Sequence, residues 1–171
     1  MSISMYDISV PVFRQILGGL AGVLEKAEAH CAAGKADAAA WIGAKLAQDM
    51  LPLSFQVGQA CNHSAGAVAK ISGGERARVA DLGSLAACRA AVAAALADLD
   101  AVKADDLAGR EAGDVVLETP RGAMTFVGLD YLLSFAMVNF YFHTTTAYDI
   151  LRAQGLEIGK RDFMGAVRLK V

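Results

Sequence analysis

The feature that most constrains the fold is a long stretch without charge near the end of the chain. No charged side chain occurs from Tyr131 through Tyr148. Asp130 precedes the stretch, where a carboxylate can accept a hydrogen bond from a free N–H of a first helical turn. Arg152 lies near its end, where the helix dipole favours a cation, and Gly155 follows as a stop signal. The sequence therefore predicts one long buried helix from Tyr131 to Leu151.

The middle of this predicted helix is polar. At helical spacing, one face carries Leu132, Ala136, Asn139, His143, Ala147 and Ile150. Burying an unpaired amide or imidazole costs on the order of 1–3 kcal/mol for each group, so the fold must supply partners. Two interpretations of His143 stay open. It is either a buried histidine hydrogen-bonded to a neighbouring helix, or a ligand or catalytic base in a pocket of a helical bundle.

The rest of the chain predicts three more long helices and one hairpin. The first helix runs from Ser4 to Cys31, and the second begins at Pro52 and ends at Gly73-Gly74. The third is capped by Ser84 and is rich in alanine. Apolar residues flank a Thr-Pro-Arg-Gly turn between Asp114 and Phe126, which predicts a small β-hairpin before the last helix. On the second helix, one polar side groups Gln56, Gln59, His63 and Lys70.

Composition limits the class of protein. The 171 residues suit a single domain, 1–171, and the net charge of −2 offers no basic surface for nucleic acid. The uncharged runs contain polar side chains that lipid would penalise, so no membrane partner is expected. Three cysteines without metal-type spacing predict reduced core thiols in a cytoplasmic protein. The predicted core residues include Leu17, Leu20, Phe135 and Phe142.

Several motifs carry a family resemblance. They are the break QDMLPLSFQVGQACNH, the segment NFYFHTTTAY and the tail LEIGKRDF, and together they span most of the chain. They resemble a branch of uncharacterised bacterial proteins, of a domain of unknown function, in the DinB-like (YfiT-like) superfamily. The resemblance implies an all-α, up-down-down-up four-helix bundle with a small β-hairpin before the last long helix. It also implies a homodimer.

The resemblance further implies a divalent-metal site built from three histidines. One comes from the second long helix, where His63 is the candidate although it lies off the apolar stripe. The other two lie one turn apart on the last helix, where this chain has Asn139 and His143. Asp49, at the break, is a further candidate that could point into the site. The predicted ligands for Zn²⁺ or Ni²⁺ are therefore His143, His63, Asn139 and Asp49.

Two functions stay open at this point. One is a degenerate metal-dependent transferase or hydrolase that uses a thiol, as the resemblance implies for some members, with a polar core pocket around Asn139 and His143. The other is a non-catalytic homodimeric helical protein that binds a small apolar ligand or a protein partner. The two differ in whether His63 or Asp49 converges on His143.

Overall fold

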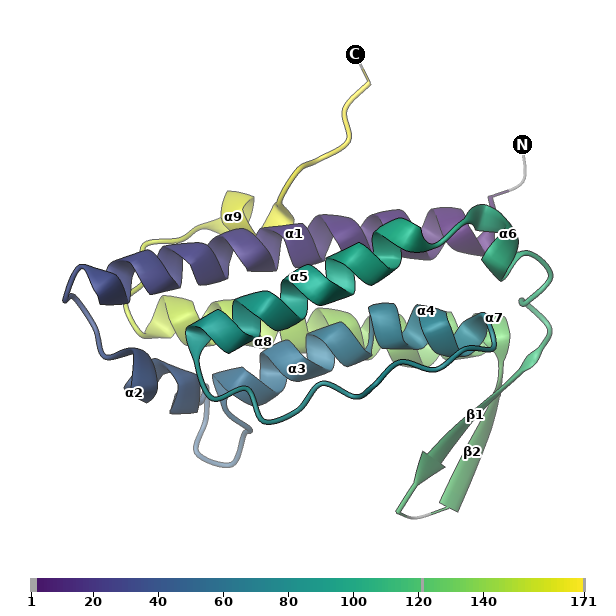
Figure 1. Ribbon diagram of the computed structural model, residues 1–171, viewed down its shortest axis with the longest axis horizontal. Coiled ribbons are helices and arrows are strands. Elements are labelled where there is room, and N and C mark those ends of the chain that lie inside the picture. Colours follow the sequence, from purple (N-terminus) through teal and green to yellow (C-terminus); the bar gives the residue numbers. More distant parts are fainter. Residues whose placement is uncertain (1–2, 121, 171) are drawn as a thin grey trace.

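The computed structural model describes residues 3–120 and 122–170. Its body is a bundle of four long helical units with up-down-down-up topology: in Figure 1 the first and last run in one direction and the second and third in the other. They are α1 (Met5–Ala32), α3 (Leu53–Asn62) with α4 (Ala65–Ile71), α5 (Leu85–Ala101), and η1 (Tyr131–Ala136) continuing into α8 (Met137–Ala153). Helix α3 packs on α8, and α1 packs on both α5 and α8. The predicted all-α bundle is confirmed.

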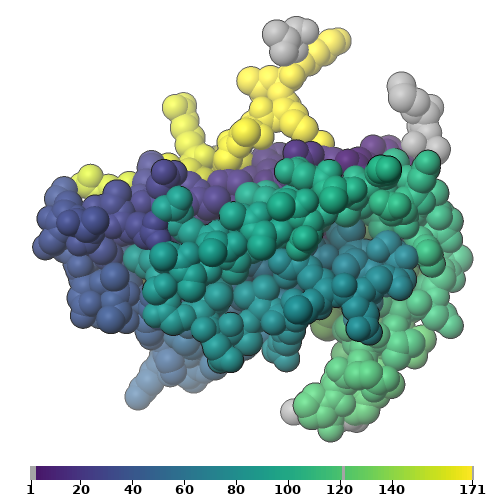
Figure 2. Space-filling model, viewed as in Figure 1, coloured from purple at the N-terminus to yellow at the C-terminus, as the bar shows by residue number. Residues whose placement is uncertain are grey.

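Short helices lie between these units and after the last of them. They are α2 (Ala38–Gly43), α6 (Ala104–Leu107), α7 (Gly128–Asp130) and α9 (Lys160–Met164). Strands β1 (Asp114–Thr119) and β2 (Gly122–Val127) pair antiparallel, with Val115 opposite Phe126. The predicted hairpin is therefore confirmed, and it projects from one end of the bundle (Figure 1). Figure 2 shows it standing away from the body beside the end of α4.

The predicted starts of the first and third long helices are confirmed by their caps. The Ser4 side chain accepts from the N–H of Asp7, whose carboxylate accepts from the backbone N–H of Ser4. The Ser84 hydroxyl accepts from the N–H of Ala87 at 3.0 Å. These local contacts satisfy N–H groups that the helix itself leaves free, which is why sequence alone located them.

The second long helix is not continuous, in contrast to the prediction. It stops at His63, and Ser64 leaves helical geometry with a φ of −113° and a ψ of −89°. The buried Ser64 hydroxyl donates to the carbonyl of Ala60 at 2.7 Å, and such side-chain bonds compete with the regular backbone ladder. The interruption places His63 at a joint between α3 and α4.

The start of the last helix also differs from the prediction. Asp130 is not its N-cap, because this residue is itself helical and its side chain accepts no capping hydrogen bond. The helical path begins at Gly128, where an added Cβ would lie 2.2 Å from the carbonyl oxygen of Arg110. Residues Tyr131–Ala136 then form a wider π-helical turn before α8. Such turns shift which side chains face the core.

The core confirms some predicted residues and corrects one. Leu17 and Leu20 are buried, and Phe135 is half-buried against the core. Phe142 is 55% exposed, so its predicted burial is wrong. Phe140 is the fully buried aromatic of this helix, and its ring meets that of Phe13 edge-on at a centroid distance of 4.8 Å.

An apolar strip remains uncovered on the outer face of α8. Val138, Tyr141 and Phe142 are exposed there at positions that share one side of a helix. The homodimer stays a prediction, and this strip is the surface on which it would be tested. Helix α1 is long and apolar enough to cross a membrane by length and composition, and half of its most apolar window is buried inside the bundle.

Candidate functional site

His143 lies between α8 and α3 with a fixed hydrogen-bond partner. It is 8% exposed, and its Nδ1 is 2.8 Å from Oε1 of Gln56. The amide of Gln56 is oriented by its Nε2, which donates to the carbonyl of Leu51 at 2.8 Å. Because Oε1 can only accept, the neutral imidazole carries its proton on Nδ1 and donates it to Gln56. Nε2 of His143 therefore keeps a lone pair for another partner.

His63 is the second histidine of the site. Its ring lies nearly parallel to that of His143, with the centroids 5.6 Å apart and an angle of 10° between the planes. Burial lowers the pKa of His143 to about 4. The pKa of His63 is also lowered to about 4, first by burial and then by the charges of His143 and Arg78. Both imidazoles are therefore uncharged at neutral pH.

The four predicted metal ligands are only partly brought together. His63 and His143 meet, although sequence spacing had placed His63 off the apolar stripe. Asn139 is half-buried on α8, and its Nδ2 donates to the carbonyl of Phe135 at 2.8 Å. Asp49 is exposed. In the part of the chain that the structure describes, no three His, Cys, Asp or Glu side chains gather as a metal-holding group.

A cavity of about 390 Å³ opens beside His63. Its walls are α3 and α4, the hairpin, the segment after α4, and η1. Beside His63, the lining includes the aromatic and apolar side chains of Tyr131, Phe135, Leu117 and Met124 and the charged side chains of Lys70, Arg76, Arg78 and Glu118. The Lys70 ammonium donates to the carbonyl of Val116 at 3.1 Å and so ties the hairpin to α4.

Sequence reasoning missed the two arginines of this wall. They lie in the extended segment after α4, which is held to the bundle by Asn62. The Asn62 side chain donates to the carbonyl of Val79 at 3.0 Å and accepts from its N–H at 2.9 Å. Arg76 and Arg78 are two residues apart, and in an extended chain that spacing points side chains to one side. This spacing was the signal from which a pair of cations on one side of the segment could have been predicted. Nothing in the sequence showed which part of the bundle the segment would pack against.

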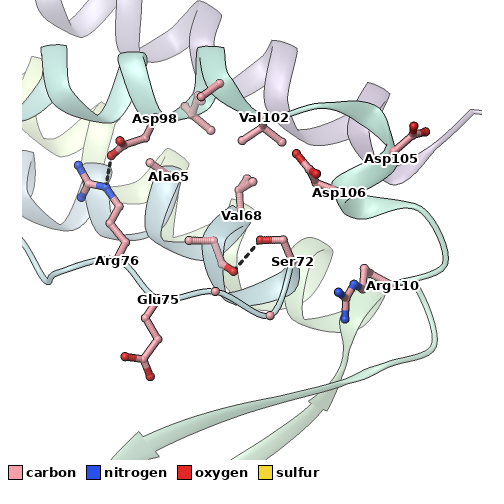
Figure 3. A pocket seen from close by; sticks show the side chains of 15 residues that line it. Ala65, Val68, Ser72, Glu75, Arg76, Asp98, Val102, Asp105, Asp106 and Arg110 are labelled. Atoms are coloured by element: carbon pink, nitrogen blue, oxygen red, sulfur yellow. Dashed lines mark hydrogen bonds and ion pairs between the residues drawn. The ribbon is translucent and has the colours of Figure 1, made fainter.

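A larger cavity, of about 710 Å³, lies between α4, α5 and α6 and is drawn in Figure 3. Val68, Leu99 and Val102 supply apolar surface, while acidic side chains and Arg110 stand at its margin. Arg76 lines both cavities, and its Nε pairs with Oδ2 of Asp98 at 2.6 Å (Figure 3). Arg76 therefore belongs to the wall between them.

The three cysteines take no part in this site. Cys61 and Cys88 are fully buried, and burial is the main reason that the pKa of each thiol is raised to about 12. Cys31 is half-buried. A thiol must be deprotonated to act as a nucleophile. Cys61 and Cys88 are therefore core side chains, as the sequence predicts.

The up-down-down-up bundle and its hairpin together define a DinB-like protein. The crystal structure of a DinB family member from Shewanella denitrificans is similar, with a TM-score of 0.87 and 32% sequence identity. The match covers 98% of this chain and 95% of that chain. The chain belongs to the family described as Domain of unknown function (DUF1993), whose model matches residues 5–164. No curated protein matches the sequence.

Proposed function

We propose that this protein binds a small organic molecule in the cavity beside His63. The observation that carries the proposal is the pair of uncharged imidazoles, His63 in the cavity wall and His143 behind it. Ligand pockets commonly have volumes of about 300–1,000 Å³ and combine apolar surface with a few placed polar groups. The cavity has both, since Tyr131 and Phe135 offer aromatic surface next to the histidine.

The pKa values favour binding over acid–base catalysis. A general base works best when its pKa lies near the working pH. The pKa of each histidine is lowered to about 4, which makes both rings weak bases at neutral pH. They remain good hydrogen-bonding groups, because a neutral imidazole offers one donor and one acceptor. Of the two functions left open by the sequence, non-catalytic binding of a small ligand is therefore the better supported.

Phenol is a suitable probe, since it joins an aromatic ring to one hydrogen-bond donor. In an NMR titration of the full chain, we expect saturable shifts of the His63 and His143 ring resonances. His30 is the internal control, because it stacks on Trp41 instead of joining this site. Replacing Phe135 with alanine should weaken the binding, because its ring packs against His63 at a centroid distance of 5.5 Å. Equal shifts at all three histidines, or no saturation, would contradict the proposal.

As a second candidate we propose that the same pair holds Zn²⁺ or Ni²⁺ weakly. The observation that favours it is the approach of two neutral imidazoles, one with a free Nε2 lone pair. The donor set is incomplete, because protein zinc sites usually have three or four ligands. Asn139 could add only its amide oxygen, and Asp49 does not join the group. An ion bound there would supply Lewis-acid chemistry.

The metal candidate predicts a rise in melting temperature at saturating Zn²⁺ or Ni²⁺ and neutral pH, since binding to the native state stabilises it. His143→Ala should abolish the rise, and His30→Ala should retain it. The rise should also shrink as the pH falls toward 4, where the imidazoles protonate and stop coordinating. If the wild-type protein shows no rise, the metal candidate is wrong and His143 serves the cavity alone.

A further inference from the structure

We propose that the cavity beside His63 selects a small aromatic carboxylate, held by Arg76 with Arg78 and Lys70 around it. The inference rests on the proposed function above and deepens it by naming the class of ligand.

The charge of the cavity wall favours an anion. Lys70, Arg76 and Arg78 line it, and Glu118 is the acidic residue among the lining side chains. The two histidines add no charge at neutral pH. Among the described residues, no ion pair includes Lys70 or Arg78. Lys70 and Arg78 are therefore not neutralised by a paired carboxylate, whereas Arg76 is paired with Asp98.

Arg76 has a donor without an acceptor. Its Nε is held by Asp98, and its side chain is only 14% exposed. Its Nη1 is buried and has no hydrogen-bond partner in the part of the chain that the structure describes. Figure 3 shows the guanidinium anchored on Asp98 and lying well away from Arg110. A buried cationic donor without an acceptor is unfavourable, and a carboxylate fits the planar fork of a guanidinium.

The segment that carries the two arginines is already ordered. Both backbone groups of Val79 are bonded to the Asn62 side chain. A Cβ added at Gly58 would lie 3.3 Å from the Val79 carbonyl oxygen, so the segment also runs close to the backbone of α3. Groups held in place before binding lose less entropy when the ligand arrives. The backbone that carries Arg76 and Arg78 is thus held in place before a ligand binds.

The rest of the wall suits a flat ring. The rings of Tyr131 and Phe135 stack with a centroid distance of 5.8 Å, and Phe126 packs on both of them. Leu117 and Met124 of the hairpin add apolar surface opposite. Aromatic surface beside a cluster of cations matches a molecule that has a ring at one end and a carboxylate at the other.

The test compares benzoate with benzamide, which has the same shape without the charge. Calorimetric titration of the full chain at low salt should give roughly tenfold tighter binding of benzoate, because bonds between charged groups are stronger than neutral ones. The preference should fall as salt screens the exposed cations. Arg76→Gln should remove most of the preference for benzoate over benzamide. The matched control Arg110→Gln, in the neighbouring cavity, should leave it unchanged.

The outcomes separate the two proposals. Equal binding of benzoate and benzamide overturns the carboxylate inference and leaves the proposed function standing. If neither compound saturates the site, both proposals fail. A folded Arg76→Gln protein that keeps the full preference also overturns the inference. If Arg76→Gln fails to fold, the same titrations are made with the double variant Lys70→Gln and Arg78→Gln. An unchanged preference for benzoate over benzamide in that double variant also overturns the inference.

Discussion

Phe140→Ala is expected to lower the free energy of unfolding by about 3–5 kcal/mol, the cost of removing a fully buried aromatic side chain. Phe140 is 0% exposed, and its ring meets the ring of Phe13 edge-on. The substitution removes that contact and leaves a cavity between α8 and α1, which pack on each other. Urea denaturation followed by circular dichroism measures the loss.

Phe142→Ala is the matched control, two residues away on the same helix. Its ring is 55% exposed, so the same substitution should cost less than about 1 kcal/mol. A large loss for Phe142 and a small one for Phe140 would show that α8 is rotated relative to this structure. The expectation for Phe142 replaces the one based on sequence, which had placed this ring in the core.

Stability is expected to fall as the pH drops from about 6.5 to about 4, by on the order of 3 kcal/mol for each of the two site histidines. The ordinary pKa of histidine is 6.5, whereas in the folded protein the pKa values of His63 and His143 are lowered to about 4. Between these values the unfolded state binds more protons than the native state. The free energy of unfolding therefore decreases as protons are added, and it is insensitive to the pair above pH 6.5.

The measurement is the free energy of unfolding as a function of pH in wild type and three variants. His63→Gln and His143→Gln should each flatten the curve within this window. His30→Gln, which replaces a histidine outside the site, should leave the curve unchanged. The carboxylates of Asp7 and Asp162 have pKa values lowered below 3.8 by their hydrogen bonds, so their contribution is lost at lower pH. An unchanged slope in both site variants would contradict the buried, neutral pair.

The bundle and its hairpin could be predicted because their signals are local. Ser4 and Ser84 bond to backbone N–H groups three residues away, and β1 and β2 on either side of the predicted turn pair with each other, although Arg121 of that turn lies outside the described residues. Such contacts join residues a few positions apart, so they can be inferred without knowledge of the rest of the fold. Which face of the last helix is buried was harder to predict, because a stretch without charged residues shows little difference in polarity between its faces. The π-helical turn Tyr131–Ala136 also rotates the side chains that follow it relative to a regular α-helix. Phe140 is therefore buried in the core, and Phe142 is exposed.

By itself the sequence determined the four long helical units, the caps at Ser4 and Ser84, and the placement of Asn139 and His143 on one face of the last helix. Only the tertiary structure decided the partners of His143, which are Gln56 from α3 and His63 from the joint between α3 and α4. It also decided that Arg76 and Arg78 stand beside them, whereas Asp49 stays exposed. The physical reason is distance along the chain. A cap or a turn satisfies groups a few residues apart, whereas these contacts exist only once α3, α8 and the segment bonded to Asn62 have packed together.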